Sequence, residues 1–482
     1  MIWLIARKEM REIVRDGRLR LLGVIVVILA LAALAFGLEQ TLRAQHAREH
    51  AMERSTDQWE GQGEKNPHVA AHYGTYVFAP TSAVTAIDPG VAPYLGRSIE
   101  IKAHKRSLAA HSEAQDSGGS KRLGAFSVAS VFLQLIPLLI IALGYGSWSR
   151  ERERGTLRQV LSTGVTRHAL FWGKALALGM SMAGLLVPAG LVIVGALWAV
   201  GGGDAATLMR VGLLAASYTL YFAIFACLTL FVSAMANTSR GALVTMVGIW
   251  GLFCLVMPRA ASEVSGLVEP LPSRAELARK VGAALKTGLD GSTERDVAIE
   301  ARVADAMDEQ GFSADALSLF ADEKAAKEAE MVKAGLLLRF AAEWENEIFD
   351  HFMNGLDDQI ASQEAVVDWA GFLSPYVAMR SLSSTLSGTD FAHHRHFTGF
   401  AERWRQDLIN SLNKAFTDNA GAQGWDYRAG KELWKNAPPF TYRSPGPMYG
   451  LWIHAVSGLA LLFWFFVALG LAWWGATRVR VV

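Results

Sequence analysis

The segment RERERGTLRQVLSTGVTRHALFWGK, residues 150–174, separates two long apolar runs and decides how the chain folds. The run before it, residues 125–149, holds 25 uncharged residues, and the run after it, residues 175–203, holds 29. Each is longer than the roughly 20 residues with which an α-helix crosses the hydrocarbon core of a bilayer. The charged segment is therefore predicted to be a loop at the cytoplasmic surface of a membrane protein, where arginine and lysine collect.

The composition combines membrane and soluble features. The 482 residues are 51% hydrophobic, and the mean hydropathy is +0.22. A net charge of +1 excludes a dominant basic surface, so nucleic acid is not an expected partner. Cys227 and Cys254 both lie in apolar runs and predict neither a disulfide framework nor a thiolate metal site.

Long uncharged runs predict a mainly α-helical, polytopic membrane protein with six transmembrane helices. The first run is not interpreted as a cleaved signal peptide, because it is longer than the 7–15 apolar residues typical of such a peptide. The predicted spans are residues 21–38, 125–148, 175–200, 207–236, 241–257 and 449–476.

The short loops predict the orientation of these helices. Basic residues fill the leader 1–20 and the loop 149–174, and they recur in the tail 477–482. The opposite short loop contains one acid, Asp204, and no base. Because positive loops stay inside, both termini are expected in the cytoplasm.

This orientation places two large insertions outside the cytoplasm. Residues 39–124 have helix-like flanks around a middle rich in proline and glycine. Residues 258–448 are numerous enough for an independent core. Apolar residues recur there every three or four positions, which predicts a mostly helical domain with Asp390 as one N-cap. The leader 1–20 predicts an amphipathic helix lying on the membrane.

Motifs for catalysis are not found in the sequence. No G-x-x-x-x-G-K-[ST] phosphate loop occurs, since Gly173-Lys174-Ala175 lacks the hydroxyl residue that would hold magnesium. No H-E-x-x-H metalloprotease motif occurs either. The chain is not expected to be an enzyme or to bind a cofactor itself.

One histidine cluster raises the question of a metal. His393, His394 and His396 follow Asp390, and His393 and His396 would share one helix face. A complete site needs further ligands, such as Asp390, that the sequence does not identify. We favour the alternative of a polar helix start whose histidines cap, stack or contact another subunit, so no metal site is assigned.

The loop 149–174 carries a more specific pattern. Glu151 and Glu153 precede Gly155-Thr156-Leu157, and an amphipathic stretch follows. This pattern resembles the cytoplasmic loop of ABC-2-type transporter permeases, where an R-E-x-E-x-G-T-L-like stretch precedes the coupling helix. The six spans and the amphipathic leader extend the resemblance. Residues 388–397 and the two large insertions are similar to a subfamily with a large periplasmic domain of unknown function.

The resemblance implies the permease subunit of an ABC transporter. A separate ATPase dimer would bind ATP and magnesium, and the leader would be a connector helix. A second permease, identical or paralogous, would enclose a pathway together with this chain. The implied direction of transport is export. The two insertions would contact a periplasmic partner. The residues implied to face the ATPase are Glu151, Glu153, Gly155, Thr156 and Leu157.

Two other functions remain open at this stage. The spans could transmit force from ATP hydrolysis to a periplasmic protein without moving a substrate, and the mass of the outer segments favours this. A membrane sensor with a ligand-binding outer domain is a third hypothesis. It predicts a cytoplasmic effector domain, which the sequence does not contain.

Overall fold

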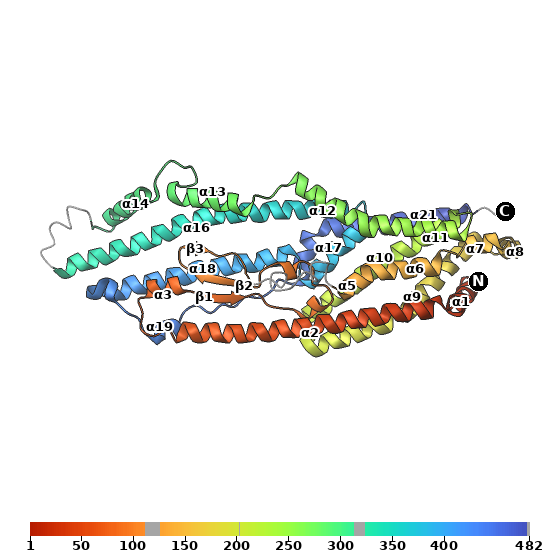
Figure 1. Cartoon of the computed structure of the whole chain (residues 1–482), viewed down its shortest axis with the longest axis horizontal. Coiled ribbons are helices and arrows are strands. Elements are labelled where there is room, and N and C mark those ends of the chain that lie inside the picture. The colour runs from red at the N-terminus through yellow and green to blue at the C-terminus, as the bar shows by residue number, and fades with distance from the viewer. Residues whose placement is uncertain (111–125, 202, 313–322, 480–482) are drawn as a thin grey trace.

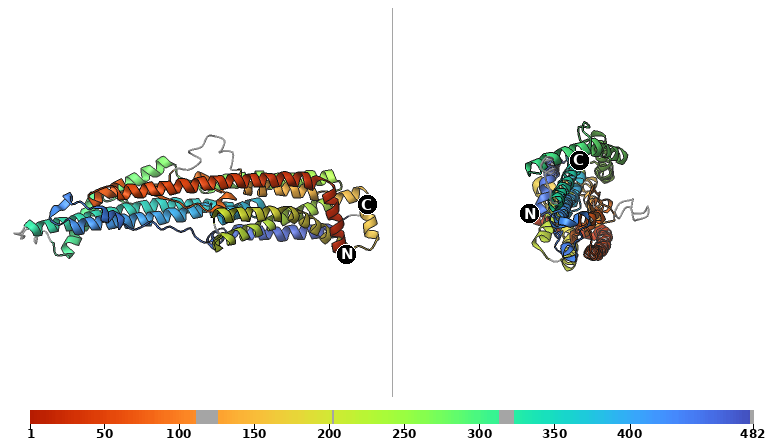
Figure 2. Two further views of the ribbon diagram at one scale, coloured as in Figure 1. Left: turned by 90° about the horizontal axis from the view of Figure 1, so that it is seen from below. Right: turned by 90° about the vertical axis from the view of Figure 1, so that its left-hand side faces the viewer.

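The computed structural model describes residues 1–110, 126–201, 203–312 and 323–479. The chain forms a long rod of helices with both termini at one end, here called the terminal end (Figures 1 and 2). The part of the rod formed by residues 39–110 and 269–446 is called the distal domain. Residues 111–125, 313–322 and 480–482 of the two predicted insertions and the tail lie outside the described residues.

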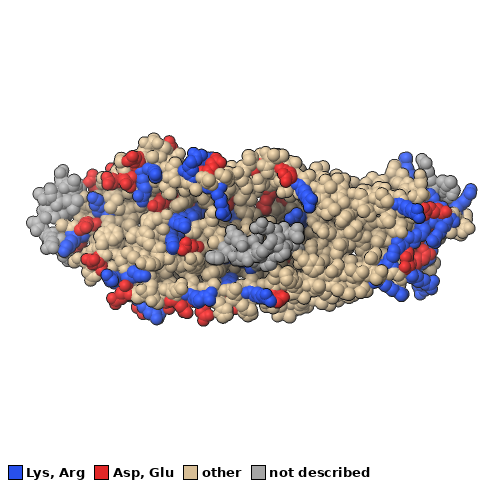
Figure 3. All heavy atoms as spheres, in the orientation of Figure 1, with Lys and Arg blue, Asp and Glu red and all other residues tan. Residues whose placement is uncertain are grey.

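Six helical segments within the described residues are long and apolar enough to cross a membrane, which confirms the predicted fold class. A broad belt of uncharged surface separates the charged terminal end from the distal domain (Figure 3). The six segments are α2 (Arg18–Glu60); α5 (Val128–Ser130) with η4 (Val131–Leu135), α6 (Ile136–Gly144) and α7 (Ser149–Glu153); α9 (Arg167–Gly201); α10 (Ala205–Met235); α11 (Ser239–Gly251) with η5 (Leu252–Val256) and α12 (Met257–Val268); and α21 (Ala455–Thr477).

Two of the spans contain a π-helical turn. These turns, η4 and η5, end two residues before Pro137 and Pro258 respectively. Proline lacks an N–H and its ring crowds the preceding turn, so a locally wider helix accommodates it. Each turn is thus explained by the proline that follows it.

The membrane bundle is organised around α10, which packs on α6 and α21. Its buried side chains include Tyr221 and Phe225, and both are fully enclosed. At the terminal end, α1 (Ile2–Arg15) lies across the bundle and packs on α9, so the predicted leader helix is confirmed (Figure 2). The short helix α8 (Thr156–Ser162) follows α7 at this end.

Two long antiparallel helices, α16 (Glu323–Ala370) and α18 (Phe391–Ala420), form the axis of the distal domain (Figure 1). Asp390 caps α18 by accepting a hydrogen bond from the His393 backbone N–H at 3.0 Å, as predicted. The other distal and connecting helices are α3 (Pro67–Tyr73), η1 (Ala83–Ala86), η2 (Ala92–Tyr94), α13 (Arg274–Thr287), α14 (Arg295–Glu309), α17 (Pro375–Ser387), η6 (Gly421–Asp426), α19 (Lys431–Lys435) and α20 (Pro447–Ile453).

The first insertion contains a small sheet that the sequence analysis does not predict. Strands β1 (Thr75–Phe78), β2 (Ser98–Lys102) and β3 (Lys105–Arg106) pair antiparallel in the order β1-β2-β3. The apolar face of the sheet packs on α18, so the two insertions share one core.

The helix α2 joins the membrane bundle to the distal domain without a break. The predicted span ends at residue 38, but the helix continues to Glu60 and is 43 residues long. At 1.5 Å per residue its length is about 65 Å, roughly twice the thickness of a bilayer core. Its outer half runs along the distal domain (Figure 2).

Candidate functional site

The predicted coupling residues lie at the terminal end, in the short helices α7 and α8 and the turn between them. Gly155 separates α7 from α8. Its φ is 69°, a left-handed backbone conformation that residues other than glycine rarely adopt. The Thr156 hydroxyl donates to the Glu151 carbonyl at 3.2 Å, and the Leu157 side chain is buried. The short loop therefore has a defined shape.

A ring of two acids and two bases ties this loop to the rest of the terminal end. The Lys174 ammonium lies 3.0 Å from a Glu151 carboxylate oxygen and 3.1 Å from one of Glu9. The Lys8 ammonium contacts the same two carboxylates at 3.2 and 3.0 Å. The Lys174 side chain is only 1% exposed. Together these contacts connect α1, α7 and α9.

Electrostatic attraction across the ring opposes the effect of burial on Glu9 and Lys8. Burial alone would raise the pKa of Glu9, but Lys174 and Lys8 lower it below its usual range. Burial alone would lower the pKa of Lys8, but Glu9 and Glu151 raise it. Removing the buried Lys174 would leave poorly compensated carboxylates in a poorly solvated position, which costs about 3–5 kcal/mol.

The rest of α7 is anchored to the turn between α10 and α11. The Glu153 carboxylate accepts hydrogen bonds from the Ser239 backbone N–H, at 3.0 Å, and from its hydroxyl. The Arg152 guanidinium donates to the carbonyls of Ala234, at 2.5 Å, and Ala236. Arg152 thus satisfies carbonyls at the end of α10, and Glu153 occupies the start of α11.

The two acids predicted to face a partner therefore contact helices of their own chain. Gly155 is exposed, Thr156 is half-buried and Leu157 faces the core. The surface that remains open on this loop belongs mainly to α8 and the turn after it. Its exposed residues are Glu153, Arg154, Gly155, Arg158, Gln159, Ser162, Thr163 and Gly164.

A second polar site lies where the distal domain meets the bundle. His454 stands between Asp368 and Asp390, with its Nδ1 2.7 Å from one carboxylate and its Nε2 3.3 Å from the other. The Ser457 hydroxyl also donates to Asp368, at 2.8 Å. These contacts join α16 and the start of α18 to α21, so the sixth span is fixed to the distal domain by buried polar groups.

A cavity of about 270 Å³ adjoins this junction. Arg210 and Asp390 are among its lining residues. The Arg210 guanidinium donates to the carbonyls of Leu386, at 3.0 Å, and Pro445, at 2.7 Å. Arg210 is the only charged residue of α10, and its burial against backbone carbonyls explains how the helix tolerates it.

The three histidines singled out in the sequence do not share a partner, and two of them form hydrogen bonds with different groups. His393 Nδ1 contacts the Asp390 carboxylate, while His396 Nδ1 lies 3.0 Å from the Tyr442 hydroxyl. Burial lowers the pKa of His394 to about 4. The structure thus engages His393 and His396 in separate hydrogen bonds.

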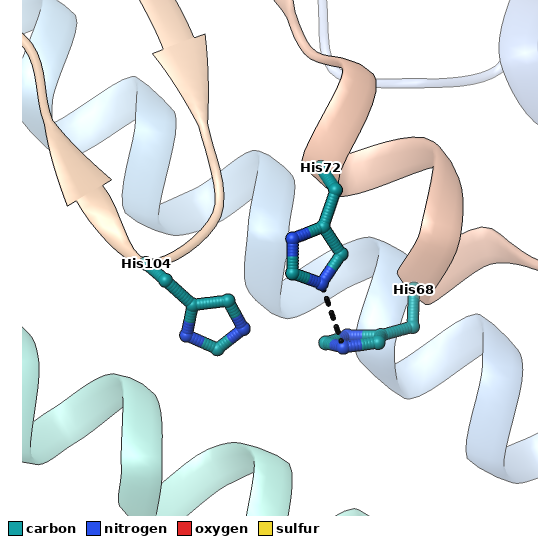
Figure 4. Close-up of side chains that lie close together, drawn as sticks. All are labelled: His68, His72 and His104. Carbon is teal, nitrogen blue, oxygen red and sulfur yellow. Dashed lines mark hydrogen bonds between the residues drawn. The ribbon is translucent and has the colours of Figure 1, made fainter.

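A different trio of histidines does converge, and the sequence analysis missed it. Within the described residues, His68, His72 and His104 form the one group of metal-ligating side chains whose ligand atoms all lie within 4.8 Å of one another (Figure 4). The i, i+4 spacing of His68 and His72 was a signal for it. His104 comes from a turn whose approach to α3 no local pattern indicates.

The fold and this terminal end define a six-span helical membrane protein whose charged surface presents a small anchored helix. A family model described as ABC-2 family transporter protein matches residues 3–474. The chain therefore belongs to the ABC-2 family and is a membrane component of a transport system. A comparison with curated proteins finds no match.

Proposed function

We propose that the chain is the permease subunit of an ABC transporter in a bacterial inner membrane, with both termini in the cytoplasm. A separate ATPase dimer, which binds ATP and magnesium, docks on the exposed face of α8. A second permease, identical or paralogous, completes the assembly, and substrate moves outward between the two. The chain itself catalyses no reaction and binds no cofactor for this role.

The observation that carries this proposal is the anchoring of the loop. Glu151 is bound through Lys174 to α9, and Glu153 is bound to the start of α11. A push on α8 is therefore passed directly to three spans instead of being absorbed by a flexible loop. The predicted role of Glu151 and Glu153 is thereby refined: they hold the docking helix in place, while exposed residues such as Gln159 meet the ATPase.

Site-specific photocrosslinking tests the docking surface. A benzophenone amino acid replaces Gln159 or Thr163 in the full chain, which is expressed in a membrane that contains its cognate transporter subunits. Both positions are exposed on or beside α8, and His50, exposed on the outer part of α2, is the matched control. We expect a crosslinked protein with a phosphate-binding G-x-x-x-x-G-K-[ST] motif from the first two positions only. Equal products from position 50, or none from α8, would refute the proposed docking face.

A second function, force transmission to a periplasmic partner, is favoured by one observation. The helix α2 is continuous over 43 residues, so movement at the terminal end displaces the distal domain as well. Inserting Gly-Ser-Gly after Gln45 breaks this rod outside the predicted span. Spin labels at Leu191, exposed on α9, and at Asp418 of α18 report movement of the distal domain relative to the bundle in the ATPase complex with and without an ATP analogue. Force transmission predicts a distance change that the insertion reduces, because the contact of α12 with α16 remains, whereas substrate transport alone predicts none.

A further inference from the structure

The trio of His68, His72 and His104 sits on rigid supports in the distal domain. His68 and His72 project from one face of α3, whose start is capped by the Asn66 side chain, with its Oδ1 2.9 Å from the His68 backbone N–H. His104 lies in the tight turn between β2 and β3. Its φ of 58° makes it the only residue other than glycine with a left-handed backbone within the described ranges. Strained residues of this kind concentrate at functional sites.

Hydrogen bonds from neighbouring helices set the direction of two of the rings. His68 Nδ1 lies 2.9 Å from the Asn413 side-chain oxygen on α18, and His104 Nδ1 lies 2.8 Å from a Glu345 carboxylate oxygen on α16. Each Nδ1 therefore carries the proton and donates it, which leaves the lone pair on Nε2. Bonds of this type orient the imidazoles of metal sites and strengthen them as ligands.

The unused nitrogens face a common point. His68 Nε2 and His72 Nε2 are 3.2 Å apart, and Figure 4 shows the three rings turned toward one another. Two imidazole nitrogens bound to one tetrahedral zinc ion at about 2.0–2.1 Å are separated by about 3.3 Å. The spacing of this pair already matches that value, and the third ligand lies within 4.8 Å.

Binding of a cation by all three Nε2 atoms requires a change of tautomer in one ring. In the metal-free trio His72 Nε2–H donates to His68 Nε2. When an ion binds, that proton moves to His72 Nδ1, so the ring stays neutral and both Nε2 lone pairs are available.

We propose that His68, His72 and His104 bind one divalent transition-metal ion of the zinc class on the distal domain. The three Nε2 atoms supply three ligands, and the fourth position is open, because His72 and His104 are exposed. Three histidines with an open position characterise sites whose metal exchanges a ligand, in contrast to closed structural sites. The bound ion connects α3 to the β2–β3 turn. This site is independent of the α8 docking surface.

Zinc binding to the purified full chain tests the proposal. The protein carries an affinity tag without histidine and is stripped with chelator, and zinc is measured by elemental analysis after equilibrium dialysis. We expect one zinc per chain above the zinc in the dialysis buffer, and we expect H72A to lose that zinc. His72 is chosen because its ring makes no described hydrogen bond outside the trio. The matched control is H46A, an exposed histidine on α2 that keeps full binding. Absence of zinc from the unmutated chain, or equal zinc in H72A, would overturn the site.

Two further measurements separate coordination from loss of folding. E345Q keeps the shape of the group that orients His104 but removes its negative charge, and it should weaken zinc binding about 10- to 100-fold in a chelator competition. Cobalt added to the unmutated chain should give the intense visible absorption of a four- or five-coordinate nitrogen site. Weak absorption typical of hexa-aquo cobalt would contradict coordination by the trio, whatever the variants do.

Discussion

Replacing Lys174 by Met should release α1 from the bundle. The side chain is 1% exposed and lies between Glu9 and Glu151, and each contact is about 3 Å. Methionine fills a similar volume but leaves the two carboxylates buried with only Lys8 between them. Breaking a buried ion pair by removal of one partner costs about 3–5 kcal/mol. The cost falls on the local attachment of α1, because the ring is its main polar contact with α7 and α9.

Hydrogen exchange of the α1 amides measures this effect. If the free energy of local opening of α1 falls by 3–5 kcal/mol, the exchange rate of its amides rises about 10²- to 10³-fold or more. The exchange of α18 in the distal domain should stay unchanged. K280M is the matched control: Lys280 is half-exposed and pairs with Glu276 at 2.8 Å, and such surface pairs contribute at most about 1 kcal/mol.

A triple variant distinguishes charge from packing. Adding E9Q and E151Q to K174M removes the uncompensated charges, so exchange of α1 should return most of the way to its original rate. If K174M changes α1 exchange less than threefold, or if the triple variant is worse than K174M, the ring is not what holds α1.

Three other predictions concern separate parts of the molecule. G155A should loosen the α7–α8 turn by about 1–2 kcal/mol through backbone strain alone, because open space surrounds its Cβ position; the measurement is ATPase stimulation in the assembled complex. Burial raises the pKa of Glu364 from 4.5 to about 7, so the folded chain holds a proton that the unfolded chain loses, and stability falls by about 3 kcal/mol as pH rises from 4.5 to 7. E364Q should abolish that fall, so its melting temperature should exceed that of the unmutated chain at pH 8 and match it below pH 4.5. W434A should cost the distal domain about 3–5 kcal/mol, because Trp434 is 1% exposed and bonds to the Gly63 carbonyl, and proteolysis of the distal domain should accelerate accordingly.

Much of the membrane architecture was predictable because few backbone conformations can cross a bilayer. A span must satisfy its backbone internally over a fixed length, so an uncharged run of sufficient length indicates a helix whatever surrounds it. The N-cap at Asp390 was predictable for a similar local reason, since its carboxylate bonds to an amide three residues along the chain.

The features that the sequence did not predict depend on distant pairings. The strand β2 gains its partner β1 from 23 residues away and is stabilised by α18, about 300 residues further on. The contact of Glu151 with Lys174 was not predictable, because Lys174 resembles one more base of a positive loop and its burial against Glu9 depends on the folded position of α1. His104 meets His68 and His72 only because a turn brings it there.

The connection from α8 to the distal domain has two routes. One runs from the ion ring through α1 and across Gly17, whose φ is 79°, into the continuous helix α2. The bend at Gly17 lets α1 lie across the bundle while α2 stays along its axis (Figure 2). The other runs from Glu153 through α11 to α12, which packs on α16 and so reaches the distal axis. Because both routes end in long unbroken helices, the proposed docking of an ATPase on α8 should displace α2 and α16 together. The His454 contact with Asp368 then limits how far the sixth span can lag behind. A rigid-body tilt of the distal domain is therefore the motion that costs the fewest contacts.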